Sequence, residues 1–121
     1  MNDEMTRQAI DEFNDALNRH DVDAVMAAMT ADCVFENTSP FPDGERYEGE
    51  VAVRDFWTTF LAGNSDRAFE AEEIVTTGDR GIVRWRYTWA NQNGTTGHIR
   101  GIDLFKTRDG KIAEKLAYVK G

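Results

Sequence analysis

The C-terminal half of the chain alternates between apolar and polar residues and is interrupted by short glycine-containing segments. These segments are TGDRG at 77–81, NG at 93–94 and DG at 109–110, all typical of turns between adjacent antiparallel strands. The pattern predicts an antiparallel meander with strands at about 68–77, 81–90, 96–107 and 111–119.

The N-terminal half has helical periodicity instead. Residues 3–19 place apolar side chains three or four positions apart, which predicts an amphipathic helix with a stripe made by Met5, Ala9, Ile10, Phe13 and Leu17. Asp21 can cap a short second helix that carries Val22, Val25, Met26 and Met29. A third helix is expected from about Glu50, and Gly63 is expected to end it in a left-handed conformation.

Between the second and third helices the sequence predicts little regular structure. CVFEN at 33–37 is typical of a short strand, whereas residues 38–49 contain both prolines and two glycines and predict a loop. Three helices followed by a meander indicate an α+β domain, and a length of 121 residues fits one domain over 1–121.

Composition excludes several functions. A net charge of −8 argues against a nucleic-acid partner, because phosphate backbones are bound by clustered positive charge. No apolar stretch is long enough to span a membrane, and the N-terminus lacks the basic and apolar regions of a signal peptide. Cys33 is the only cysteine, which suits a reducing cytoplasm, and one Cys with two His makes a metal site of these residues improbable.

The strand at 81–90 has one aromatic face, formed by Val83, Trp85, Tyr87 and Trp89. This face is expected to pack toward the helices. A curved sheet lined by large rings can leave a hollow for a small apolar ligand, or the rings can fill the space completely. The residue types favour neither alternative.

Asp103 is the unusual residue of the next strand. Alternation groups it with Ile99, Gly101 and Phe105 on the face expected to look inward, although a bulge near Gly101 would reverse the assignment. A carboxylate removed from water needs a partner or takes up a proton. Asp103 is therefore either a carboxyl with a raised pKa and a catalytic role, or an acid paired with a basic side chain or exposed at an edge.

Three stretches carry a resemblance to a known family: ALNRHDVDAVMAAMTADCVFEN, YEGEVAVRDFW and GIDLFKTRDGKIAEKLAYV. Their order and spacing resemble the nuclear-transport-factor-2-like (NTF2-like) superfamily, in its SnoaL-like branch near ketosteroid isomerases and polyketide cyclases. The resemblance implies an NTF2-like cone, with three N-terminal helices packed on a curved, mostly antiparallel sheet around an internal pocket. It also implies a homodimer formed through the outer sheet face.

The resemblance makes Asp103 the main catalytic candidate. Asp103 matches the acid that ketosteroid isomerases keep protonated and the acid/base aspartate proposed for SnoaL-type cyclases. The isomerase's oxyanion-hole tyrosine corresponds to Phe13 and its general base to Asn37 or Thr38, none of which can do that chemistry. An authentic ketosteroid isomerase is therefore disfavoured.

Two further residues are candidates from the same comparison. Asn37 matches the water-positioning asparagine of limonene-epoxide-hydrolase relatives, but their acids correspond to the segment 84–86 and Ala117, which lack carboxylates, so epoxide hydrolysis is disfavoured. SnoaL-type cyclases use a histidine on the strand before the aspartate, whereas His98 lies on the strand of Asp103 itself with opposite parity.

The sequence thus predicts a protein that binds a small apolar molecule. It is either a cofactor-independent isomerase, cyclase or lyase acting on a carbonyl-bearing ligand, or a non-catalytic module for ligand binding or protein interaction. Asp103, Asn37 and His98 are the candidate catalytic residues. The expected pocket lining consists of Phe13, Phe35, Phe56, Trp57, Trp85, Tyr87 and Val119.

Overall fold

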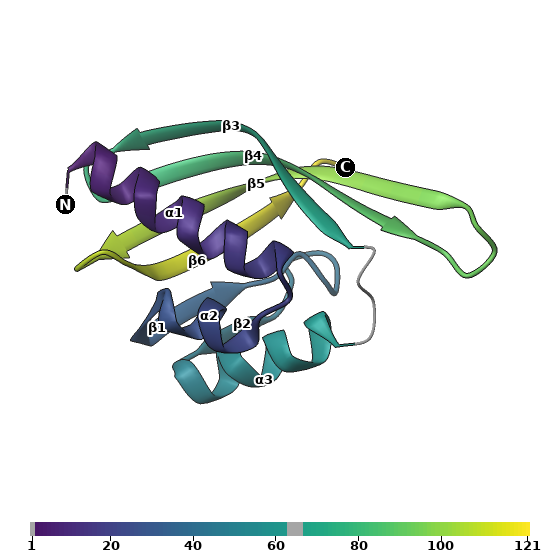
Figure 1. The fold of residues 1–121 in the computed structure, drawn as a ribbon, viewed down its shortest axis with the longest axis horizontal. Helices are drawn as coiled ribbons and strands as arrows, with labels where there is room; N and C mark the ends of the chain where they lie inside the picture. Colours follow the sequence, from purple (N-terminus) through teal and green to yellow (C-terminus); the bar gives the residue numbers. More distant parts are fainter. Residues whose placement is uncertain (1, 63–66) are drawn as a thin grey trace.

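The structure, a computed structural model, describes residues 2–62 and 67–121 and contains three helices and six strands (Figure 1). The helices are α1 (Asp3–Asn18), α2 (Val22–Ala27) and α3 (Glu50–Leu61). The strands are β1 (Met29–Glu36), β2 (Arg46–Glu48), β3 (Ala68–Thr77), β4 (Arg80–Ala90), β5 (Thr96–Arg108) and β6 (Lys111–Val119). The predicted α+β class, with three helices before an antiparallel meander, is confirmed.

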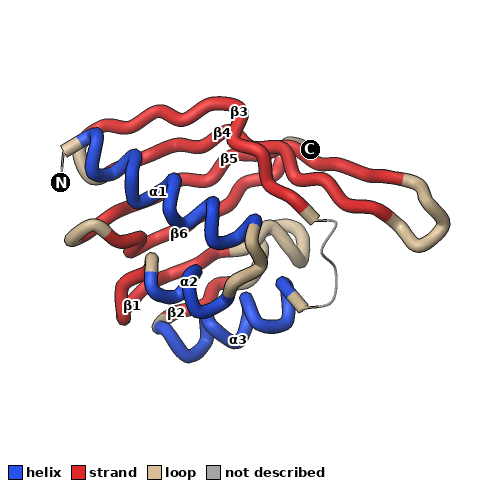
Figure 2. Tube along the Cα trace, in the orientation of Figure 1, coloured by secondary structure: helices blue, strands red, loops and turns tan. Residues whose placement is uncertain are grey.

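The strands form one curved sheet in the order β2-β1-β6-β5-β4-β3, and the helices cover its concave face (Figure 2). All neighbouring strands are antiparallel except β1 and β6, which are parallel. The core lies between helices and sheet and includes Phe13, Trp57, Val83 and Phe105. The β4–β5 hairpin continues beyond the helices (Figure 1).

The segment between α2 and α3 departs from the sequence prediction. β1 begins at Met29, which the periodicity had assigned to the second helix, because Met29 pairs with Ile112 of β6. The predicted loop contains β2, which pairs antiparallel with the end of β1. Both strand boundaries are set by pairing with distant segments rather than by local sequence. The predicted helix end at Gly63 lies outside the described residues.

The faces of β5 are as the alternation predicted. Gly101, Asp103 and Phe105 are buried on the inner face, while Arg100 and Ile102 are exposed on the outer one. Gly101 has a steric reason to be glycine: a Cβ there would lie 2.6 Å from the Trp85 ring and would overlap the Tyr118 carbonyl oxygen. The missing side chain lets the indole pack directly on the strand.

A β-bulge in β6 changes which residues face inward. Lys106 pairs with Glu114 and Thr107 with Ile112, so Ala113 is the extra residue on β6. Strict alternation would place Ile112 and Lys115 on opposite faces. Because of the bulge both are buried, with exposed fractions of 0% and 3%.

Helix α1 is fastened to the sheet at both ends. Near its start, the Asp3 carboxylate accepts a hydrogen bond from the Gly78 N–H of the β3–β4 turn. At its last residue, the Asn18 amide donates to the Phe69 carbonyl and accepts from the Phe69 N–H, both at 2.8 Å. Within the described ranges, no helix combines the length and apolar character needed to cross a bilayer.

Candidate functional site

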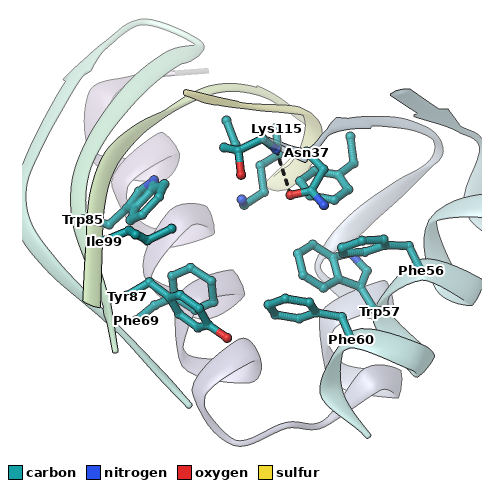
Figure 3. A pocket seen from close by; sticks show the side chains of 12 residues that line it. Asn37, Phe56, Trp57, Phe60, Phe69, Trp85, Tyr87, Ile99 and Lys115 are labelled. Atoms are coloured by element: carbon teal, nitrogen blue, oxygen red, sulfur yellow. Dashed lines mark hydrogen bonds between the residues drawn. The ribbon is translucent and has the colours of Figure 1, made fainter. Parts of the chain in front are cut away.

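A pocket opens between α3 and the concave face of the sheet (Figure 3). Its cavity volume is about 80 Å³, which is smaller than the roughly 300–1,000 Å³ typical of small-molecule sites. Its lining is mostly aromatic and consists of Phe35, Asn37, Thr38, Phe56, Trp57, Phe60, Phe69, Trp85, Tyr87, Ile99, Lys115 and Ala117. The rings therefore do not fill the hollow completely.

Most of the predicted lining residues do lie on this pocket, namely Phe35, Phe56, Trp57, Trp85 and Tyr87. Two do not. Phe13 is fully buried in the core, with edge contacts to the rings of Trp57 and Phe105. Val119 lies past the end of the pocket, opposite Gly101, and borders a shallow hollow with Tyr118 and Lys120. Alternation alone could not show where along β6 the pocket ends.

Asp103 forms a buried ion pair with Lys115, the central feature of the inner end of the pocket. The Lys115 Nζ lies 3.1 Å from Asp103 Oδ2, and each residue is 3% exposed. The two residues are diagonal neighbours, because Asp103 is opposite Ala117 and Phe105 is opposite Lys115. The inward position predicted for Asp103 is confirmed.

Burial raises the pKa of Asp103 above its ordinary value, and the nearby Lys115 ammonium and Trp85 indole only partly offset this effect. Asp103 Oδ1 has no hydrogen-bond partner among the described residues. A carboxyl group with a free oxygen and a raised pKa can both accept a proton and return it.

Lys115 separates Asp103 from the pocket. Its ammonium lies 4.9 Å from the centroid of the Phe35 ring and 5.8 Å from that of Trp57, so ring faces partly surround the charge. Lys115 lines the pocket and Asp103 does not. A ligand would therefore meet the amine directly and the carboxyl only through it.

Sequence reasoning missed Lys115, although it is the cation at the centre of the site. Unbroken alternation from Ile112 would turn it outward, whereas alternation from Val119 would turn it inward. Its pairing with the inward Phe105 fixes it inward, and the bulge at Ala113 lets Ile112 face inward as well. An available signal was the inward Asp103, because a buried carboxylate calls for a cation on a neighbouring strand.

Asn37 also lines the pocket, at the same end as Lys115 (Figure 3). Its side-chain oxygen accepts a hydrogen bond of 2.8 Å from the Thr38 N–H, which stabilises the start of the loop after β1. The oxygen of the amide thus has a structural role, and its NH₂ group is the part suited to contact a ligand oxygen.

His98 lies apart from the other two candidates. It is exposed on β5, opposite Thr88 and with the parity of the outer face, and does not line the pocket. The structure therefore does not bring His98 together with Asp103 or Asn37. Side chains an odd number of positions apart along a regular strand, such as His98 and Asp103, project from opposite faces of the sheet.

The inner part of the pocket contains more hydrogen-bond donors than acceptors. The indole N–H of Trp57 has no partner among the described residues, and an ammonium can donate three hydrogen bonds. Within the same residues, no group of three His, Cys, Asp or Glu side chains is placed to hold a metal ion. The arrangement suits a ligand that presents an oxygen acceptor from an apolar ring system.

Comparison with known structures places this fold among NTF2-like proteins. An NTF2-like protein of unknown function from Mesorhizobium loti is 36% identical, with a TM-score of 0.81 and coverage of 98% of this chain and 93% of that one. A candidate SnoaL-like polyketide cyclase from Jannaschia sp. CCS1 is 18% identical (TM-score 0.79; 98% and 87% covered). A candidate ketosteroid isomerase from Kribbella flavida is 16% identical (TM-score 0.81; 98% and 80% covered).

No curated protein matches the sequence significantly. The profile of the SnoaL-like domain, however, matches residues 10–115, which include every helix after the first turns of α1 and most of the sheet. The chain therefore belongs to the SnoaL-like domain family.

Proposed function

We propose that the protein binds a small apolar ring compound carrying a carbonyl or enol oxygen and catalyses proton transfer on it, as in an isomerisation or a cyclisation, without a cofactor. The observation that carries the proposal is the Lys115–Asp103 pair at the inner end of an open aromatic pocket. Lys115, rather than Asp103, is the group that would contact the ligand.

The ammonium supplies what such a reaction needs. When water at the mouth of the pocket takes up a proton from the carbon next to a carbonyl, negative charge develops on the oxygen, and a fixed cation at the inner end stabilises that charge more strongly than water does. Lys115 uses one donor on Asp103 and has donors left for a ligand oxygen. The Asn37 NH₂ group can approach the same oxygen.

Asp103 has an indirect part in this scheme. It holds the ammonium in place between the Phe35 and Trp57 rings and can exchange a proton with it. Two structural neighbours are named as a candidate polyketide cyclase and a candidate ketosteroid isomerase, which agrees with this chemistry. These two proteins resemble this chain in fold alone. A cytoplasmic location stays a prediction from the single buried Cys33.

The test uses 2-tetralone, a two-ring ketone with exchangeable hydrogens. NMR in deuterated buffer measures hydrogen exchange next to the carbonyl, and quenching of tryptophan fluorescence measures binding. We expect catalysed exchange that falls by at least about tenfold in Lys115→Met. Lys111→Met, which removes an exposed lysine from the same strand, should leave the rate unchanged.

Two results would change the assignment. Binding that depends on Lys115 without any catalysed exchange would support the non-catalytic alternative, a ligand-binding module. Absence of binding by 2-tetralone and by related ring ketones would contradict the proposed pocket function itself.

A further inference from the structure

We propose that Lys115 forms an imine with an aromatic aldehyde or ketone bound in the pocket, so that this protein can act by covalent amine catalysis. The inference rests on the proposed function, because it assumes a carbonyl-bearing ligand in the same pocket. It adds a chemical step that charge stabilisation alone does not require.

The position of the amine suits attack on a ring-bound carbonyl. Lys115 Nζ is buried, lines the pocket and lies over the Phe35 ring. An aromatic ligand stacked among Phe56, Phe60 and Tyr87 would extend toward the end of the pocket where Lys115 and Asn37 lie (Figure 3). A carbonyl at the inner end of the ligand would then face the amine.

Only a neutral amine is a nucleophile, so Lys115 needs a nearby group that can take its proton. Asp103 is that group, at 3.1 Å, and its Oδ1 has no other partner among the described residues. Burial raises the pKa of this carboxyl, so it accepts a proton more readily than an ordinary aspartate.

The step balances without any oxidant or reductant. The Lys115 nitrogen attacks the carbonyl carbon, the C–N bond forms, and the carbonyl oxygen takes up the proton released by the amine. The resulting hydroxyl leaves as water when the C–O bond breaks, and the proton that it needs passes from Asp103 through the Lys115 nitrogen. The net change is the loss of one water, and the imine makes the neighbouring C–H bond more acidic.

The chain is well suited to a trapping experiment, because it has only four lysines. Lys111 and Lys120 are exposed and Lys106 is partly exposed, so they report background modification. The protein is incubated with 2-naphthaldehyde and sodium cyanoborohydride, and the modified residue is identified by peptide mass spectrometry.

We expect Lys115 to be modified at least about tenfold faster than Lys111. Lys115→Arg keeps the positive charge but cannot form an imine, so it should lose this fast adduct, whereas Lys111→Arg should retain it. Asp103→Asn should slow adduct formation by about tenfold or more, because it removes the proton acceptor. Mapping on the unchanged protein gives a result even if a variant folds poorly.

A parallel binding measurement separates the two proposals. 2-Naphthalenemethanol has the same rings but no carbonyl, and its binding is followed by tryptophan quenching. If it binds while Lys115 is modified no faster than Lys111, the imine proposal is wrong and the pocket function stands. If neither compound binds, both proposals are wrong.

Discussion

At the residue scale, the buried pair of Lys115 and Asp103 is costly for the fold. Removing two charges from water costs several kcal/mol per ion, and their attraction repays this only with good geometry and further hydrogen bonds. Here Asp103 Oδ1 lacks a partner among the described residues. Such a pair in an aromatic pocket is better explained by chemistry than by stability.

A double-mutant cycle tests this explanation. Lys115→Met or Asp103→Val alone should lower the free energy of unfolding by about 3–5 kcal/mol, because each leaves an unpaired buried charge. The combined variant should recover to the stability of the natural sequence or exceed it, while losing ligand binding. Urea denaturation measures all four proteins. If the stability losses of the two single variants simply add up in the combined variant, the explanation that the pair costs stability in exchange for function is wrong.

The raised pKa of Asp103 predicts a pH dependence of stability. The folded protein keeps this proton at pH values where the unfolded chain, with a pKa near 3.8, has released it. The stabilising contribution is therefore complete below that value and is lost as pH rises through the folded pKa. The Asp103→Val/Lys115→Met variant should not show this loss of unfolding free energy with rising pH. Unfolding free energies compared from about pH 4 to pH 8 check it, and parallel profiles would contradict a raised pKa.

At the element scale, the position of the pocket depends on how α1 and β6 attach to the rest of the sheet. The pairing of β6 with β5 turns Lys115 inward opposite Phe105, and the two hydrogen bonds from Asn18 fix the part of β3 that carries Phe69, a lining residue. A helix end thereby holds one wall of the pocket although it contributes no side chain to the lining.

Asn18→Ala should weaken this attachment. Loss of two exposed hydrogen bonds is expected to cost about 1–2 kcal/mol and to speed hydrogen exchange of the Phe69 amide. Gln8→Ala is the matched control on the same helix, because the partner of the Gln8 amide within residues 2–62 and 67–121 is Glu12, one turn away at 3.2 Å. Equal stability losses in the two variants, or unchanged exchange at Phe69, would contradict a specific role for Asn18.

At the scale of the whole molecule, the outer face of the sheet is uncovered. It exposes Val75, Ile82, Ile102 and Tyr118, which are 37% to 53% exposed, beside the ion pairs of Arg84 with Glu73 and Arg100 with Glu72. Apolar side chains bordered by both charge signs suit contact with a second copy of the same face.

We therefore propose a homodimer through this face at micromolar concentration. Ile102→Lys adds a cation next to Arg84 and Arg100 and should shift the protein to a monomer, as measured by light scattering. Val51→Lys is the control, because Val51 is 73% exposed on α3, away from the sheet face. A monomeric natural protein, or equal effects of both variants, would contradict this interface.

The sequence by itself determined the elements and the inward side of the meander. Turn residues and period-two alternation are local properties, so the pattern around 77–110 was sufficient to place the strands and to turn Asp103 toward the core. Helical spacing likewise placed α1 and α3.

Only the tertiary structure decided what Asp103 meets there. A single bulge at Ala113 reverses the alternation of β6, so the two ends of the strand give opposite assignments for Lys115, and only its pairing with Phe105 of β5 fixes it inward. Whether the rings leave a hollow, and that Phe13 and Val119 lie outside it, depends on how large side chains from distant segments fill a shared volume. Residue types fix the volumes of those side chains, whereas packing fixes the space between them.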